Sequence, residues 1–279
     1  MRHVWAGILV VALALVSPAT GRAQSYSAFE FKTPAAFVVS AFRNEEITRF
    51  LETLDRLLAA PTDPGTWAAN ASDVLTMFAR RMQTGRLSTA QEARVVARLE
   101  AIGASRPDAA AVVQGPLQVI RQLTVGKVAP DIIGTDFDGK PLRLRDHRNK
   151  VVLLAFSAEW CGICRAQVPY ERFLEDRYER WPFALLTVQT GTSRETAKRA
   201  QDETGISSRA WWDAPNGVAP HGAIAAAWQV SGWPSTYVID GDGIIRFVDV
   251  RDEELLKAVR QLVEAQADRD AKASHPKSR

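Results

Sequence analysis

The residues most able to do chemistry are Cys161 and Cys164, the only two cysteines among the 279 residues of the chain. A disulfide between them would close a loop too short to constrain the unfolded chain strongly, so stability is a poor reason for the pair. An exported protein held together by structural disulfides would carry several cysteines spread along its sequence. The spacing therefore indicates thiol–disulfide chemistry.

Cys161 follows a predicted strand and begins a predicted helix, at a place that favours a thiolate. The apolar run from Val151 to Phe156 precedes it, and a helix is expected from Cys161 to about Arg180. Unpaired backbone N–H groups and the positive end of the helix dipole stabilise a negatively charged sulfur there. Cys164 comes one helical turn deeper. We therefore expect Cys161 to attack a partner disulfide and the more shielded Cys164 to resolve the mixed disulfide.

Three other interpretations of the two cysteines have to be weighed. A zinc site would need a second pair of ligands, whereas His147 and His221 are single and far apart in the sequence. Inert core cysteines fit badly with the flanking Trp160 and Gly162. A peroxiredoxin-like cysteine would follow a Thr or Ser by three positions, where this chain has Ala158. The sequence predicts no metal site and keeps a thiol peroxidase as an alternative function.

Strands alternating with helices surround the cysteines after a boundary near Gly126. Residues 132–133 and 142–144 flank Asp138-Gly139, a dipeptide typical of hairpin turns. This alternation predicts an α/β domain at 126–268, with a mixed sheet covered by helices. The expected strands cover 151–156, 183–188, 210–212, 236–239 and 244–250, and the expected helices 161–180, 193–204, 223–230 and 253–266.

Residues 24–125 carry a different pattern, without any catalytic constellation. Their apolar residues recur at helical spacing, which predicts a small all-α region of unknown role. Ser88 is a candidate N-cap, and Glu92 is placed to complete a capping box with it, one position late. The expected helices cover 47–58, 67–82, a segment after Ser88 and a segment after Pro107.

Residues 1–23 have the layout of a secretory signal peptide. Arg2 precedes an apolar run at 4–16, and small residues follow it. The run is shorter than the roughly 20 residues that span a bilayer, so cleavage is favoured over a retained membrane anchor. Cleavage is predicted after Ala23, with Ala19 as the alternative. We therefore expect the mature protein in the periplasm or otherwise exported.

The charge balance gives no argument for nucleic acid. The chain carries 35 Lys and Arg against 32 Asp and Glu, a formal net charge of +3. The two signs are interleaved, which is typical of solvated helix faces. The last residues, 269–279, form a charged tail.

Two segments resemble known signatures of the thioredoxin superfamily. Residues 151–164 read VVLLAFSAEWCGIC, which is similar to the superfamily's active-site segment. The lead-in at 128–131 and Pro169 are similar to the TlpA/ResA group of exported thiol–disulfide oxidoreductases. Residues 232–240, GWPSTYVID, are similar to that group's second signature, in which the proline is cis and packs against the cysteines. Two signatures in this order make the resemblance specific.

The resemblance covers residues 126–268 and implies a thioredoxin-like fold and an enzyme that exchanges thiols and disulfides. It implies no cofactor. The expected partners are client proteins, with apocytochrome c as one candidate, and an inner-membrane electron donor that keeps the enzyme reduced. The backbone before the proline would contact an extended client segment. The site residues it implies are Cys161 and Cys164 as catalytic groups, and Trp160, Trp233 and Pro234 as substrate contacts.

Two departures from the family concern the acids that handle protons. Thioredoxins carry a buried Asp where this chain has Ala155, and ResA-like proteins carry a Glu where it has Gln167. Glu159 is the only acid beside the motif, and an exposed loop carboxylate is a weak substitute. We expect water to take the proton and the pair to act as a reductant. A redox-sensitive interaction module, docking a partner through residues 35–124, is the alternative from another class.

Overall fold

The computed structural model describes residues 42–59, 64–105, 107–214 and 222–274. All of these residues belong to one compact unit. The predicted signal peptide lies outside the described residues. Within the described part of the chain, no helix combines the length and apolar character needed to cross a membrane.

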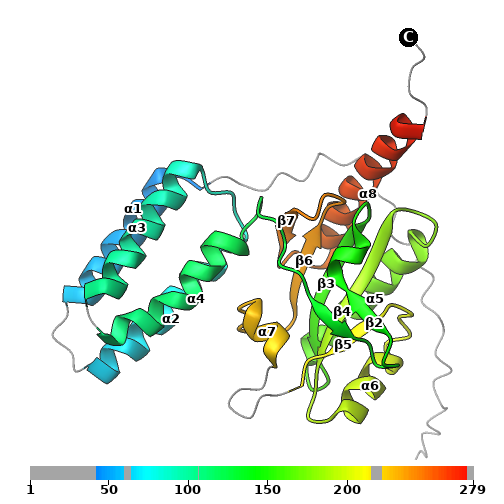
Figure 1. Cartoon of the computed structure of the whole chain (residues 1–279), viewed down its shortest axis with the longest axis horizontal. Helices are drawn as coiled ribbons and strands as arrows, with labels where there is room; N and C mark the ends of the chain where they lie inside the picture. The colour runs from blue at the N-terminus through cyan, green and yellow to red at the C-terminus, as the bar shows by residue number, and fades with distance from the viewer. Residues whose placement is uncertain (1–41, 60–63, 106, 215–221, 275–279) are drawn as a thin grey trace, which may run out of the picture. The chain divides into compact units, whose positions relative to one another are not determined.

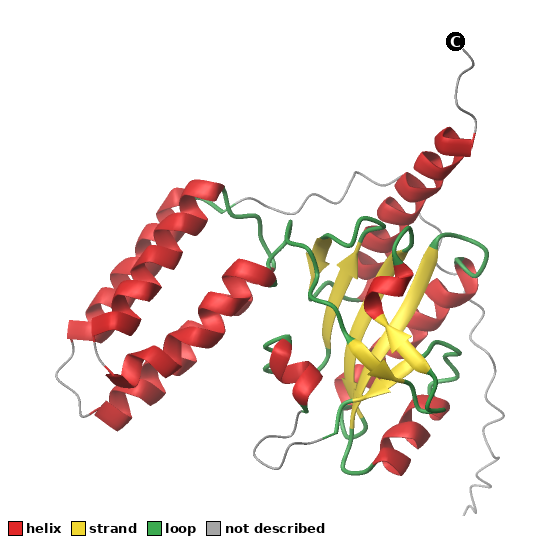
Figure 2. Ribbon diagram, viewed as in Figure 1, coloured by secondary structure: helices red, strands yellow, loops and turns green. Residues whose placement is uncertain are grey.

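A five-stranded mixed sheet forms the centre of the α/β part (Figures 1 and 2). The strand order is β5-β4-β3-β6-β7, with β3 (Val151–Ala158) in the middle. β3 runs parallel to β4 (Phe183–Thr190), which runs parallel to β5 (Ala210–Trp212). On the other side, β6 (Ser235–Ile239) and β7 (Ile245–Val248) add antiparallel strands. The predicted mixed sheet is confirmed.

Helices and a short hairpin cover this sheet. α5 (Gly162–Arg177) and α8 (Asp252–Ser274) contact each other, and they pack against β4 and β3 respectively. α6 (Arg194–Glu203) contacts β4 and β5. The predicted α/β thioredoxin-like fold class is therefore confirmed. The other elements of the α/β part are β1 (Ile133–Thr135), β2 (Pro141–Arg143), the 3-10 helix η2 (Leu144–His147) and α7 (Ala223–Ala227).

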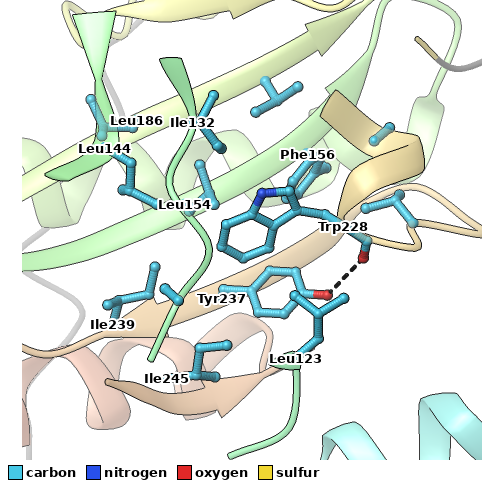
Figure 3. Close-up of a cluster of buried hydrophobic side chains, with 14 of the residues drawn as sticks. Leu123, Ile132, Leu144, Leu154, Phe156, Leu186, Trp228, Tyr237, Ile239 and Ile245 are labelled. Atoms are coloured by element: carbon cyan, nitrogen blue, oxygen red, sulfur yellow. Dashed lines mark hydrogen bonds between the residues drawn. The ribbon is translucent and has the colours of Figure 1, made fainter. Parts of the chain in front are cut away.

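Three aromatic rings form the centre of the apolar core on one face of the sheet (Figure 3). The ring centroids of Trp228 and Tyr237 are 4.8 Å apart in a T-shaped arrangement, and Phe156 lies 5.8 Å from Trp228. The Tyr237 hydroxyl donates a hydrogen bond to the Trp228 carbonyl at 3.4 Å. Large rings with a satisfied polar atom contribute much of the apolar burial in such a core. They hold β6 against β3 from one side.

Four helices precede the sheet, as the sequence predicts. They are α1 (Asn44–Ala59), α2 (Pro64–Gln83), α3 (Thr89–Ser105) and α4 (Pro107–Gln122). We call them the helical region. Their apolar stripes meet in a separate core cluster, because each helix places residues three and four apart on one face. Its members include Ile47, Leu54, Leu75, Met82, Val95, Leu99, Ile102 and Ile120.

The N-terminus of α3 differs from its prediction. The Gln91 backbone N–H donates to Ser88 Oγ at 3.2 Å, and the Ser88 N–H donates to Gln91 Oε1 at 3.0 Å. Gln91 stands at the third helical position, where a capping box needs its amide. Glu92 points elsewhere and binds the Lys127 ammonium at 2.6 Å. The prediction of a capping box through Glu92 is wrong.

α8 also differs, because it continues to Ser274 rather than ending at Gln266. Alanine is the best helix former, and the segment after Gln266 holds three alanines among charged residues. The Gln266 side chain donates to Asp270 one turn later at 2.8 Å. Part of the tail predicted as charged and irregular is therefore helical.

Candidate active site

The two cysteines lie where β3 ends and α5 begins. Cys161 is the N-cap residue of α5, and its Sγ accepts a hydrogen bond from the Cys164 backbone N–H at 3.1 Å. The two sulfurs form a disulfide, with Cα atoms 5.3 Å apart. In the reduced protein this N–H and the helix dipole would act on the Cys161 sulfur. The geometry therefore favours a thiolate at Cys161.

Exposure does not distinguish the two cysteines in the disulfide form. Cys161 is 6% exposed and Cys164 is 5% exposed. The expected greater shielding of Cys164 is therefore not a feature of the oxidised structure, in which both cysteines belong to one buried cluster packed by Trp233. The N-cap position of Cys161, rather than burial, supports its assignment as the attacking sulfur.

Pro234, the proline of the second signature, directly follows Trp233 in the chain. The Trp233–Pro234 peptide bond is cis. The Trp233 ring packs against the cysteine pair, and its centroid lies 5.2 Å from that of Trp160 in a T-shaped arrangement. The antiparallel pairing of β6 with β3 brings this loop to the end of β3. The structure thus brings Trp160 and Trp233 together at the cysteine pair, and Pro234 is the next residue in the chain after Trp233.

Polar contacts hold the segment 231–236, which we call the proline loop. The Arg251 guanidinium donates to the Pro234 carbonyl at 3.0 Å. The Thr236 backbone N–H donates to Asp249 Oδ1 at 3.2 Å. Both partners come from the short segment between β7 and α8. Sequence reasoning missed them, since no local pattern links that segment to the loop.

The two positions that lack the family's acids are both buried. Ala155 lies within β3, and Gln167 lies one turn after Cys164 on α5. The Gln167 side-chain N–H donates to Asp252 Oδ1 at 2.7 Å, and the Asp252 backbone N–H donates to Gln167 Oε1 at 3.1 Å. The carboxylate of Asp252 therefore bonds directly to the residue that replaces the family's Glu. Sequence reasoning missed it.

Glu159 is not the solvated loop carboxylate that the sequence suggests. Its Oε1 accepts hydrogen bonds from the Thr192 N–H at 2.8 Å and from the Thr192 hydroxyl at 2.6 Å. Burial alone would raise the pKa of Glu159, but these bonds, with Thr196 and the charge of Arg199, hold that pKa below its usual value. A carboxylate held ionised in this way is a poor proton acceptor. Its contacts instead join the loop before Cys161 to the loop after β4.

A cavity of about 190 Å³ adjoins Cys164. Its lining includes Glu159 and Gln189, and it is large enough to hold water. Glu159 Oε2 is buried and has no hydrogen-bond partner among the described residues. Arg165 lines the cavity too, and its guanidinium donates to the Glu159 carbonyl at 3.1 Å. The arrangement supports water as the proton acceptor for Cys164.

Glu171 is a second acid that sequence reasoning missed. It lies on α5 seven residues after Cys164, on the same buried stripe as Gln167 and Leu174. The helical rise places it about 10 Å from Cys164 along the axis, too far for direct proton transfer. Burial raises the pKa of Glu171 to about 7. The i, i+3, i+7 spacing from Cys164 is the signal that could have found it.

Other titratable groups do not gather into a metal site. Among the described residues, no group of three or more His, Cys, Asp and Glu side chains could hold a metal ion. Burial lowers the pKa of His147, which disfavours its charged form. His221 lies outside the described residues.

Known proteins resemble the part of the chain that carries this site. Residues 125–248 match the model of the AhpC/TSA family. The thiol-disulfide oxidoreductase ResA of Geobacillus kaustophilus is 28% identical over 124 residues, which are 44% of this chain and 68% of that protein. The thioredoxin-like protein YneN of Bacillus subtilis is 29% identical over 129 residues, 45% of this chain and 71% of that protein. The helical region lies outside the family match.

Among solved structures, the thioredoxin domain of a thiol-disulfide oxidoreductase from Bacteroides vulgatus is similar to this chain. Its sequence is 24% identical and the TM-score is 0.45. The alignment covers 51% of this chain and 99% of that domain.

Proposed function

Because residues 125–248 match the AhpC/TSA family model and resemble ResA, we propose that the chain is a thiol–disulfide oxidoreductase acting on the cysteines of client proteins outside the cytoplasm. One observation carries the proposal. The disulfide at the N-terminus of α5 lies against Trp233, the residue that precedes the cis Pro234. This arrangement presents a reactive sulfur next to backbone that an extended client can reach.

The exchange can be written with its electrons and protons balanced. The Cys161 thiolate attacks a client disulfide, and the client sulfur that leaves takes a proton from water. The Cys164 thiol then gives its proton to water in the adjoining cavity. Its thiolate attacks the Cys161 sulfur of the mixed disulfide, which forms the Cys161–Cys164 disulfide and releases the second client sulfur. Two electrons pass from the enzyme to the client.

The surface around the cysteine pair suits an apolar client segment. Trp160 is 51% exposed and Ile163 is 59% exposed, which is unusual for side chains of this size. Together with the ring of Trp233 they form an apolar rim at the disulfide. An extended segment with an apolar side chain next to its cysteine would bury part of this rim.

The proposed direction is reduction of the client. The helix N-terminus stabilises the Cys161 thiolate nearly alone, whereas strong oxidants stabilise their reduced form heavily. Export is supported by the layout of residues 1–23 and by the resemblance to an exported group. An electron donor in the inner membrane would then return the disulfide to the dithiol.

Insulin reduction tests the reaction. The wild-type chain, reduced with dithiothreitol, should precipitate the insulin B chain, and Cys161→Ser should abolish this activity. Cys164→Ser should accumulate a mixed disulfide with the client through Cys161. Peroxide consumption that survives Cys164→Ser would instead favour the thiol peroxidase and contradict the proposal.

The reduction potential of the cysteine pair tests the direction. A value near that of thioredoxin, about −270 mV, is expected for a reductant. A value near that of DsbA, about −120 mV, would overturn the proposed direction. Equilibration with glutathione buffers gives this measurement on the full chain.

A further inference from the structure

Arg80, near the end of α2, lies against Gly232 before Pro234 and reaches Thr236 after it through Asp249. A methyl group built on Gly232 would lie 3.1 Å from Arg80 Nη1, so the guanidinium lies directly against the loop backbone. Arg80 Nη2 also pairs with Asp249 Oδ2 at 3.5 Å. The other oxygen of that carboxylate accepts the Thr236 N–H at 3.2 Å. One side chain of the helical region thus reaches both ends of the proline loop.

Gln83 lies one turn later on the same face of α2. Its side-chain N–H donates to the Tyr237 hydroxyl at 2.9 Å, and both side chains are buried. Tyr237 directly follows the proline loop in β6, and its hydroxyl donates onward to the Trp228 carbonyl (Figure 3). A buried hydrogen bond of this kind is costly to break, because its partner loses solvation as well. Gln83 therefore fixes the start of β6.

Apolar and polar contacts of α4 extend the same junction. Val119 of α4 belongs to the core cluster of the sheet, as does Ala79 of α2. The Gln118 side-chain N–H donates to the Ala227 carbonyl at 2.7 Å. A cavity of about 240 Å³ beside the junction is lined by Arg80, Gln83 and Ser231, among others. The proline loop therefore has room to shift when these two α2 side chains are shortened.

We propose that the helical region is a positioning element for client binding, and that Arg80 and Gln83 are its positioning residues. They hold the proline loop in the place where a client segment lies beside the cysteine pair. The statement about clients rests on the proposed function. The hydrogen bonds of the two residues go to Asp249 and to Tyr237, so their effect on the reaction passes through the loop.

Because Arg80 and Gln83 act through the proline loop, their loss should affect a protein client and a small disulfide differently. A protein client needs both the cysteine pair and the proline loop, because its backbone has to lie along the loop. A small aromatic disulfide such as dithiobis(nitrobenzoate) needs only the Cys161 sulfur. Loss of the two α2 side chains should therefore slow exchange with a protein while leaving exchange with the small disulfide unchanged.

The test uses the full chain with the double substitution Arg80→Ala and Gln83→Ala. We expect kcat/KM for insulin reduction to fall about tenfold, mainly through KM, since misplaced binding groups lose much of their effect. The rate with dithiobis(nitrobenzoate) and the reduction potential should stay at the wild-type values. Amide hydrogen exchange at 232–237 should become faster. The single variant Arg80→Lys keeps the positive charge, so it should retain most of the wild-type rate of insulin reduction.

Arg81→Ala is the matched control. Arg81 is the next residue on α2 and pairs with Glu46 inside the helical region at 3.4 Å. It should leave insulin reduction and hydrogen exchange at 232–237 unchanged. If the double variant does not fold, Arg80→Gln alone carries the same comparison, since its side chain is partly exposed.

Two outcomes would overturn the inference. Unchanged insulin reduction together with unchanged hydrogen exchange at 232–237 would show that the helical region does not position the loop. An equal loss with insulin and with the small disulfide would place the effect on the cysteine pair instead. A wild-type chain that fails to reduce insulin would contradict the proposed function, and hydrogen exchange at 232–237 would still decide whether Arg80 and Gln83 hold the loop.

Discussion

The proline loop and helix α5 flank the same cysteine pair but are built differently. On the loop side, charged groups bond directly to the backbone, as Arg251 does to the Pro234 carbonyl and Asp249 to the Thr236 N–H. On the α5 side, the family's nearby acids are replaced by Ala155 and a neutral amide. The remaining carboxylates lie further from the sulfurs. In the proposed mechanism, protein groups fix the place of the client, and water accepts the proton of the resolving cysteine.

The α5 side still has two carboxylates, Asp252 and Glu171, but neither occupies a position of the family's acids. Asp252, at the exposed start of α8, accepts a hydrogen bond from the Gln167 side chain. Glu171 lies two turns beyond Cys164, inside the fold. Neither can touch the Cys164 sulfur directly, so each affects it only through intervening groups.

The largest effect on the α5 side is expected for Glu171→Gln. The folded state raises the pKa of Glu171 from 4.5 to about 7, so the protonated form is favoured by folding. The stability that this group contributes is fully present below pH 4.5 and is lost as the pH rises through 7. Glutamine does not ionise, so the variant should gain about 3 kcal/mol in the free energy of unfolding at pH 8 and little at pH 4. Urea titrations at the two pH values measure this difference.

The internal control is pH 4, where the variant and the wild type should unfold with nearly the same free energy. A gain for Glu171→Gln that does not depend on pH would mean that the buried carboxyl imposes no electrostatic cost on the folded state.

The substitution Gln167→Glu would restore the family's acid. Both the α5 side and the loop side of the cysteine pair would then have a charged group nearby. The new carboxylate would face Asp252, and the like charge would raise its pKa towards neutrality, where it can accept the Cys164 proton. We expect release of the mixed disulfide at pH 7 to become about tenfold faster. Stopped-flow measurement of client release gives the rate. Ala166→Glu, a charge on the exposed side of the same turn, should not change it, and equal rates in both variants would contradict the expectation.

Arg251→Ala should weaken the loop side. It removes the donor to the Pro234 carbonyl, and the loss of one such bond corresponds to about a fivefold lower kcat/KM for insulin. Exchange with dithiobis(nitrobenzoate) should not change. Lys257→Ala, in the helix α8 that follows Arg251, is the matched control. A parallel loss with the small disulfide would show that Arg251 acts on the cysteines rather than on the client.

Glu159→Gln should have the smallest effect. The variant loses the charged acceptor of the Thr192 bonds, worth about 1 kcal/mol of stability at pH 7. Because the folded pKa of Glu159 is held below 4.5, this stability is present above pH 4.5 and is lost as the pH falls through the folded value. Thermal unfolding should show a difference from the wild type at pH 7, and this difference should shrink as the pH is lowered below 4.5. The rate of disulfide exchange should change less than twofold. A larger loss would show that Glu159 takes part in proton transfer and would contradict the expectation.

Local patterns in the sequence predicted most elements of the sheet because burial dictates them. The continuous apolar run at 151–156 and the hairpin dipeptide Asp138-Gly139 each correspond to the expected strand or turn. The capping box of α3 was placed one residue too late, because Glu92 and Gln91 are both compatible with it by type and only geometry separates them. The end of α8 was placed too early, since a charged helix beyond the core carries no apolar stripe.

Only the parts of the site that are defined by residue type and by short spacing in the sequence could be predicted. The cysteine pair and the proline signature could be read directly, and the structure brings them together. Asp252 and Arg251 could not be found, because their partners Gln167 and Pro234 come from other elements and only the packing of α8 joins them. The contacts of Arg80 are also tertiary, so residues 24–125 showed no sign of a role near the site.

The short turn after β7 has a consequence for engineering. Two of its residues, Asp249 and Asp252, have left-handed backbones, with φ of 55° and 52°, and between them Arg251 reaches the proline loop. The family match ends at Val248, immediately before this turn. A domain transplanted up to that border would keep both cysteines and lose the groups that hold their surroundings. The smallest portable unit of this redox centre therefore extends through α8.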